Sequence, residues 1–176
     1  IYADPKWREG EYPPNDPPRS GLASARMMAM VSYRSHASFD DRFGRERMPE
    51  NGKTGDDIPY TVESYLRYQG DKLVDRFDAN CYVHLTQQMD AHDVSRNRGK
   101  YEAVLASIQQ PTLVVGIDSD VLYPLTEQRE LVEHLPNATL DILSAPHGHD
   151  SFLIEIDALN DLVVGWRAEA QTSVAA

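Results

Sequence analysis

The last third of the sequence alternates apolar runs with helical patterns, and this alternation constrains the fold more than any other feature. Residues 112–117 and 139–143 form two short apolar runs, and a helical pattern at 125–135 separates them. A continuous apolar run is typical of a strand that is buried on both faces of a parallel sheet. With further helices expected at 100–108 and 152–168, the pattern predicts a β-α-β unit at the edge of an α/β fold.

Polar side chains follow both expected strands, at the point where open parallel sheets collect their reactive groups. Asp118 and Asp120 follow the first strand, and His147 and His149 follow the second. An imidazole that acts as a general base needs a carboxylate to fix its tautomer and to stabilise its cationic form. Asp120 is well placed for that role, and Asp118 is the competing choice. The structural alternative is that the aspartates cap a helix or form an Asx turn, and that the histidines are ordinary loop residues.

A serine nucleophile of the hydrolase type needs small residues around it, in the pattern Gly-x-Ser-x-Gly, because it occupies a strained strand-to-helix turn. The sequence contains no such pentad. The nearest match, Gly-Leu-Ala-Ser-Ala at 21–25, lacks the second glycine and a preceding apolar strand. The chain also starts at Ile1, inside what reads as mid-protein sequence. We therefore expect the C-terminal part of a larger enzyme whose serine lies elsewhere.

Composition divides the chain into four segments. The first residues are rich in Pro, Gly and charge, which disfavours regular structure. A long stretch with helical patterns and almost no strand signal follows, as in an insertion that caps an active site, and the α/β pattern comes last. We expect an extended segment at 1–20, a helical cap at 21–97, the last β-α-β-α part of the core at 98–170, and a frayed tail at 171–176.

Three helices are predicted within the cap. A run of helix formers predicts one from Ser20 to about Ala37, and apolar spacing predicts two more at about 61–73 and 79–90. Residues 39–60 are strongly charged and contain several Pro and Gly residues, so they should form a surface loop. The single cysteine, Cys81, cannot form an internal disulfide and should pack in the core.

The charge balance and the apolar runs exclude several functions. Asp and Glu outnumber Lys and Arg by 28 to 17, and no basic stripe stands out, so nucleic-acid binding is not expected. No apolar stretch approaches the roughly 20 residues of a membrane span, and a lone cysteine suits a reducing compartment. We therefore expect a cytoplasmic protein. No metal site is expected around Asp90 and Asp93 with His84 and His92, because their spacing fits no known ligand set.

Five motifs occur in order along the chain. They are Gly-Leu-Ala-Ser-Ala-Arg at 21–26, Tyr-Leu-Arg-Tyr-Gln-Gly at 65–70, Arg-Phe-Asp-Ala-Asn at 76–80, Asp-Ser-Asp-Val-Leu-Tyr-Pro at 118–124 and Gly-His-Asp-Ser-Phe-Leu at 148–153. Together they resemble the homoserine O-acetyltransferases, and the similarity runs from about Asp4 to Ile154. The resemblance implies the C-terminal portion of an α/β-hydrolase fold with a helical cap insertion.

The resemblance also implies a ping-pong reaction. An elbow serine takes acetyl from acetyl-CoA, and the hydroxyl of an amino-acid-type acceptor, homoserine by default, attacks the acyl-enzyme. Asp120 and His149 would complete the triad. Arg26 would hold the carboxylate of the acceptor, a role that suits a planar guanidinium, and Tyr33 would lie beside Arg26. Asp150 would bind the ammonium group of the acceptor. Their structural alternatives are a surface Arg, a core Tyr and an Asp that caps the last helix.

No metal and no tightly bound cofactor is implied, and acetyl-CoA is a co-substrate. The expected partner is the N-terminal chain or segment of the same enzyme, which carries the serine, and a homodimer is a candidate assembly. The cluster Arg42, Arg45 and Arg47 could attract the phosphates of CoA or form a solvated loop paired with nearby acids.

Two other activities stay open: O-acetylation of deacetylcephalosporin C in antibiotic synthesis, and ester hydrolysis with the same triad. Without the serine the chain should be inactive.

Overall fold

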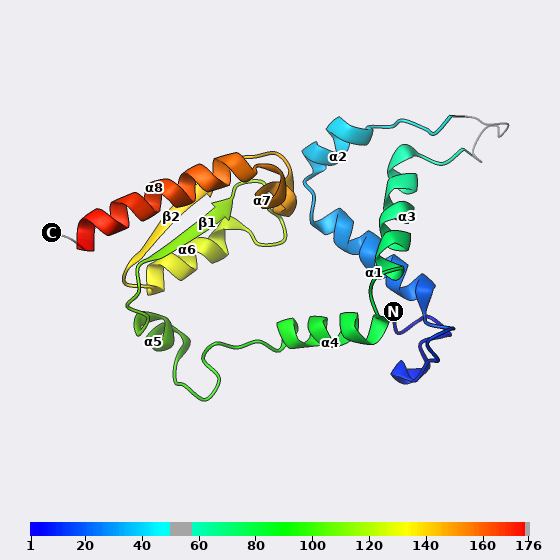
Figure 1. Cartoon of the computed structure of the whole chain (residues 1–176), viewed down its shortest axis with the longest axis horizontal. Helices are drawn as coiled ribbons and strands as arrows, with labels where there is room; N and C mark the ends of the chain where they lie inside the picture. The colour runs from blue at the N-terminus through cyan, green and yellow to red at the C-terminus, as the bar shows by residue number, and fades with distance from the viewer. Residues whose placement is uncertain (50–57, 175–176) are drawn as a thin grey trace. The chain divides into compact units, whose positions relative to one another are not determined.

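The computed structural model describes residues 1–49 and 58–174, and the chain separates into two compact units. The first, which we call the helical unit, comprises Ile1–Val31 and Phe39–His92. The second, the sheet unit, comprises Ser32–Ser38 and Asp93–Ala176. Figure 1 traces the chain through both units. The short segment Ser32–Ser38, which lies within the expected cap, thus belongs with the sheet.

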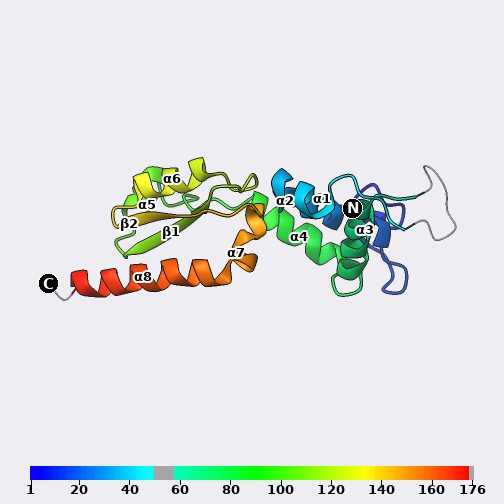
Figure 2. The same ribbon diagram turned by 90° about the horizontal axis from the view of Figure 1, so that it is seen from above.

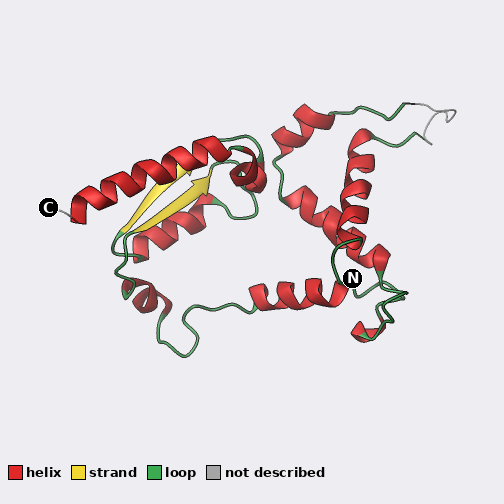
Figure 3. Ribbon diagram, in the orientation of Figure 1, coloured by secondary structure: helices red, strands yellow, loops and turns green. Residues whose placement is uncertain are grey.

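The described part of the helical unit is built from helices, as Figure 3 shows. Its core forms around the buried side chains of Leu22, Leu73 and Ala79, against which Trp7 and Phe77 pack. The last helix begins at Ala79 because the carboxylate of Asp78 accepts a hydrogen bond from the Cys81 amide at 3.0 Å. The helices are η1 (Arg8–Gly10), α1 (Arg19–Ser32), α2 (His36–Phe43), which runs into this unit from the sheet unit, α3 (Thr61–Val74) and α4 (Ala79–Asp90).

The sheet unit contains a two-stranded parallel sheet between helices. Thr112 lies opposite Ala138, and Ile117 lies opposite Leu143. Figure 2 shows α6 on one face of the sheet and α8 on the other, so the β-α-β prediction is confirmed. The elements are α5 (Tyr101–Ala106), β1 (Thr112–Ile117), α6 (Leu125–His134), β2 (Ala138–Leu143), η3 (Gly148–Asp150), α7 (Ser151–Ile154) and α8 (Ile156–Val174).

The helix expected from Ser20 to Ala37 is interrupted, which corrects the sequence prediction. It ends at Ser32, and α2 starts at His36. Two contacts explain the break. The Tyr33 carbonyl accepts a hydrogen bond from the Asp150 amide at 3.0 Å, and the Ser35 hydroxyl caps α2 by accepting from the Ser38 amide at 3.0 Å. A contact distant in sequence therefore overrides the helix propensity of this run.

The expected loop at 39–60 is partly regular. Residues 39–43 continue α2, and Arg47 forms an antiparallel bridge with Tyr60. Residues 50–57 of that loop lie outside the described residues. Cys81 is exposed on α4, so the prediction that it packs in the core is wrong.

The closing helix also differs from the prediction of one element at 152–168. It is divided into α7 and α8 at Glu155, whose backbone has a ψ of 50° and leaves the helical region. α8 then runs to Val174, so residues 171–174 of the expected tail are assigned to the helix. No Gly or Pro follows Gly165, and nothing in that sequence stops the helix. Within the described residues, every helix is too short or too polar to cross a bilayer.

Candidate active site

Two loops leave the sheet at the same edge because β1 and β2 are parallel and end opposite one another, at Ile117 and Leu143. We call residues 118–124, after β1, the acid loop, and residues 144–150, after β2, the histidine loop. The edge formed by the carboxyl ends of parallel strands is where α/β folds place ligands and reactive groups. The candidate active site is built where these two loops meet.

His149 and Asp120 form a hydrogen-bonded pair at this edge. His149 Nδ1 lies 2.8 Å from Asp120 Oδ2, and the side chains are 24% and 4% exposed. The other carboxylate oxygen accepts hydrogen bonds from the amides of Leu122 and Tyr123 at 2.8 and 3.0 Å. Asp120 therefore closes an Asx-type turn with one carboxylate oxygen and faces the imidazole with the other. Because the carboxylate engages Nδ1, Nε2 is the ring nitrogen that remains for proton transfer.

Asp118, the competing carboxylate, has a different role in the structure. It accepts hydrogen bonds from the Ser144 hydroxyl at 2.6 Å and from the Ala145 amide at 3.1 Å. Hydrogen bonds from these two donors lower the pKa of the Asp118 carboxyl below its usual value, and the Ser144 hydroxyl has the larger effect. Asp118 thus ties the start of the histidine loop to the acid loop, and Asp120 is the carboxylate beside His149.

Three aromatic rings surround the His149 imidazole. The ring centroids of Tyr33, Tyr123 and Phe152 lie 5.5, 5.2 and 5.3 Å from that of the imidazole. The pair also lines a cavity of about 340 Å³ with apolar residues of both strands. The imidazole, which is 24% exposed, therefore lies against aromatic and aliphatic side chains.

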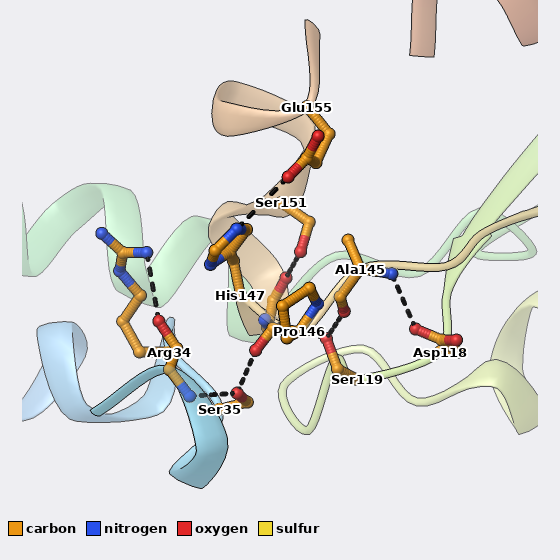
Figure 4. Close-up of polar contacts among 11 residues, drawn as sticks. Arg34, Ser35, Asp118, Ser119, Ala145, Pro146, His147, Ser151 and Glu155 are labelled. Carbon is orange, nitrogen blue, oxygen red and sulfur yellow. Dashed lines mark hydrogen bonds and ion pairs between the residues drawn. The ribbon is translucent and has the colours of Figure 1, made fainter. Parts of the chain in front are cut away.

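The backbone of the histidine loop is held by serine hydroxyls from three other segments (Figure 4). Each hydroxyl donates a hydrogen bond to one carbonyl of the loop: Ser119 to Ala145, Ser35 to Pro146, and Ser151 to Gly148. Because carbonyl groups that leave a strand end lack ladder partners, these bonds satisfy them and fix the path of the loop.

Gly148 allows the histidine loop to pass close to the Ser32–Ser38 segment. Its φ is +73°, a conformation that residues with a side chain rarely adopt. A Cβ at this position would also lie 2.5 Å from the Ser35 nitrogen and 2.8 Å from the Arg34 carbonyl carbon. The glycine of the Gly-His-Asp motif is therefore required by both backbone conformation and space.

Asp150 is bound by the same segment. Its Oδ2 lies 3.2 Å from Arg34 Nε, and the two side chains are 17% and 15% exposed. Its side chain makes no capping hydrogen bond to α7, so the alternative that Asp150 caps that helix does not hold. The carboxylate, at the end of the histidine loop, pairs instead with the Arg34 guanidinium.

The predicted site residues divide between the units. Asp120, His149, Tyr33 and Asp150 belong to the sheet unit, and Tyr33 contacts the imidazole. Arg26 belongs to α1 in the helical unit, and its role stays a prediction. His147 pairs with Glu155, with Nε2 and Oε1 3.2 Å apart, and is not part of the His149–Asp120 pair.

Sequence reasoning missed four residues that build the site: Arg34, Ser35, Ser119 and Ser151. Ser119 could have been found from its place between the two aspartates, in a motif that ends a strand. Ser35 could have been found as an N-cap residue. The pairing of Arg34 with Asp150 gives no signal in the sequence, because it joins distant segments. Ser151 makes a local contact, to the carbonyl of Gly148 three residues earlier.

The other clusters considered from the sequence are the acidic stretch around Asp90 and the arginines of residues 42–47. In the described ranges 1–49 and 58–174, no group of three or more His, Cys, Asp or Glu side chains is placed to hold a metal ion. The Arg42 guanidinium lies over the rings of Phe43 and Tyr65, at 5.1 and 4.8 Å from their centroids. Arg47 lies 4.6 Å from the ring centroid of Tyr60. Aromatic rings therefore contact both guanidinium groups.

Comparison with known proteins gives close relatives of the chain. A homoserine O-acetyltransferase from Salinibacter ruber is 71% identical over 176 residues, which are 100% of this chain and 49% of the relative. A relative with the same name from Chloroherpeton thalassium is 53% identical over 96% of this chain and 43% of its own length. The chain thus spans about half the length of the curated relatives it matches. No family model matches it.

Solved structures share the fold. Homoserine O-acetyltransferase from Bacillus anthracis matches with a TM-score of 0.82 at 18% identity, over 94% of this chain and 45% of that one. Esterase E22 matches with a TM-score of 0.80 at 21% identity, over 94% of this chain and 47% of that one. The prediction of part of an α/β-hydrolase fold is confirmed. Because one match is a transferase and the other an esterase, fold alone does not separate acetyl transfer from hydrolysis.

Proposed function

The chain belongs to the homoserine O-acetyltransferase family, and we propose that the enzyme it contributes to transfers an acetyl group to the side-chain hydroxyl of homoserine. The observation that carries this proposal is the 2.8 Å contact between His149 and the buried Asp120 carboxylate at the sheet edge. A His–Asp pair of this kind activates a hydroxyl nucleophile. The identity to named homoserine O-acetyltransferases supplies the substrate class.

We propose acetyl-CoA as the donor and a serine outside these 176 residues as the nucleophile. His149 Nε2 takes the serine proton as the oxygen attacks the thioester carbonyl, and Asp120 stabilises the imidazolium. The carbon–sulfur bond breaks, and the thiolate receives that proton. In the second half-reaction His149 takes the proton of the acceptor hydroxyl as its oxygen attacks the acyl-enzyme. The bond between the acetyl carbon and the serine oxygen breaks, and His149 gives the proton to that oxygen. The absence of Gly-x-Ser-x-Gly from the sequence supports a nucleophile from elsewhere.

Asp150 is proposed to bind the ammonium of the acceptor. An ionised carboxylate has about four lone-pair sites, so Asp150 can pair with Arg34 and still accept from an ammonium. The ion pair with Arg34 would fix the orientation of the carboxylate before substrate binds. Arg26 and Tyr33 are proposed to contact the carboxylate end of the acceptor.

Hydrolysis is the second candidate, because the same His149–Asp120 pair could activate a serine for a reaction in which water replaces the acceptor alcohol. The test uses the complete enzyme that contains this chain. Release of CoA from acetyl-CoA is measured without acceptor, with homoserine and with deacetylcephalosporin C. We expect CoA release that depends on homoserine, with O-acetylhomoserine as product. Turnover that is equal without acceptor would support hydrolysis, and a clear preference for deacetylcephalosporin C would support the antibiotic activity.

A further inference from the structure

We propose that Ser119 is a positioning residue that keeps the histidine loop in register with the acid loop, so that the His149 imidazole meets Asp120. The proposal rests on the proposed function, because the alignment of that pair is observed through acetyl transfer. Ser119 itself touches no reacting atom in this scheme. It acts through the backbone of the residue that precedes His149.

The Ser119 hydroxyl uses both of its hydrogen-bonding capacities on the histidine loop. It accepts from the Gly148 amide at 2.9 Å and donates to the Ala145 carbonyl. A hydroxyl that donates and accepts at once has a fixed rotor and a fixed distance to both partners. One side chain therefore sets the separation of the two loops and the orientation of two loop peptides.

The two loops meet in a one-to-one register. Ser119 bonds to Gly148, and the next residue of the acid loop, Asp120, pairs with the next residue of the histidine loop, His149. The contacts are 2.9 and 2.8 Å long. A shift of the loop at Gly148 would therefore move the imidazole away from the carboxylate. Displacements of about 1 Å in a catalytic site can lower rates by as much as about 100-fold.

Gly148 makes this support necessary. With no side chain, glycine has more conformational freedom than any other residue, and here it stands at a φ of +73° directly before His149. The hydrogen bond from Ser119 restrains the peptide at that point. Ser35 and Ser151 bind loop carbonyls, but the Gly148 amide donates to Ser119.

The chain offers a matched control in Ser144. Its hydroxyl donates to Asp118 at 2.6 Å and so also joins the two loops. That bond lies at the strand end of the histidine loop, on an exposed residue, away from the Gly148–His149 peptide. Loss of a general loop attachment is therefore tested by Ser144→Ala, and loss of the register is tested by Ser119→Ala.

The experiment compares Ser119→Ala, Ser119→Cys, Ser119→Thr and Ser144→Ala in the complete enzyme. The alanine and cysteine variants should lower kcat by roughly 10- to 100-fold, with the KM for homoserine changed less than about 3-fold. Cysteine keeps the size but is a weak hydrogen-bonding group, so it decides the matter if the alanine variant fails to fold. Threonine keeps the hydroxyl and should retain kcat within about 3-fold, as should Ser144→Ala.

A second readout is the low-field proton NMR signal of the Nδ1–H of His149, which reports its hydrogen bond to Asp120. We expect this signal to be lost or shifted in the alanine and cysteine variants of Ser119 and unchanged in Ser144→Ala. A normal kcat and an unchanged signal in those Ser119 variants would overturn the proposal. So would equal losses of activity in Ser119→Ala and Ser144→Ala. If the unmodified enzyme transfers no acetyl group, the proposed function fails instead.

Discussion

The acid loop and the histidine loop contribute one residue each to the candidate active site, but they are held in different ways. Asp120 is fixed by amides of its own loop, those of Leu122 and Tyr123. The loop that carries His149 has one local bond, from Ser151, but it is also fixed from outside, by the hydroxyls of Ser119 in the acid loop and of Ser35 just before α2. The carboxylate is thus positioned by local sequence, and the imidazole is positioned by tertiary contacts.

The largest expected effect comes from the imidazole itself. His149→Ala should lower acetyl transfer by at least about 1000-fold in the complete enzyme, because the serine loses its general base. Steady-state rates of CoA release with homoserine measure this. His147→Ala is the matched control in the same loop. Its contact with Glu155 is partly exposed, so its removal should change kcat by less than about 3-fold. Comparable losses in both variants would show that the loop, and not the imidazole, is what matters.

The next effect tests the choice between the two aspartates. Asp120→Asn should lower kcat by on the order of 1000-fold, since the amide cannot stabilise the imidazolium and favours the wrong tautomer. Asp118→Asn should cost less than about 10-fold, because Asp118 binds the hydroxyl of Ser144 and the amide of Ala145 and not the imidazole. Single-turnover measurements of acyl-enzyme formation compare the two. A larger loss for Asp118 would reverse the assignment.

A third test addresses the external support of the histidine loop. Gly148→Ala should destabilise the protein by about 2–4 kcal/mol, because it combines a positive φ with a clash against the backbone of Arg34 and Ser35. Gly99→Ala is the control, since Gly99 has a φ of +121° but a Cβ added there would meet no atom within 4 Å. It should cost about 1 kcal/mol. Urea unfolding of both variants measures the difference, and equal costs would mean that close contact at Gly148 is unimportant.

The smallest expected effect is a pH dependence at Asp118. The Ser144 hydroxyl and the Ala145 amide lower its pKa below the ordinary value of 3.8 in the folded state. A depressed folded-state pKa adds stability that is fully present above the unfolded-state value and is lost as the pH falls through the folded-state value. The stability difference between the unmodified protein and Asp118→Asn should therefore shrink below about pH 4. A difference that stays constant down to pH 2 would contradict this.

The contrast between the loops explains what the sequence could predict. Apolar runs and helix formers are local signals, and they predicted β1, β2 and α6 within one or two residues. The position of Asp120 after a strand, in a segment able to form an Asx turn, is local as well. The motif resemblance predicted part of the α/β-hydrolase fold and the family, and both are confirmed.

Features that depend on distant contacts could not be predicted in the same way. The break between α1 and α2 exists because Tyr33 and Ser35 bind the histidine loop, more than 100 residues further along the chain. The pairing of Arg34 with Asp150 has the same origin. Helix propensity carries no information about such contacts, so the sequence favoured one uninterrupted helix.

The central claim is that the His149–Asp120 pair activates a serine supplied by sequence outside these 176 residues. The most direct measurement is the distance from His149 Nε2 to the nearest serine Oγ in a crystal structure of the complete enzyme. The account predicts a distance of about 2.6–3.2 Å to a serine within Gly-x-Ser-x-Gly, with His149 Nδ1 still bonded to Asp120. A structure in which Nε2 faces away from every such serine would contradict it.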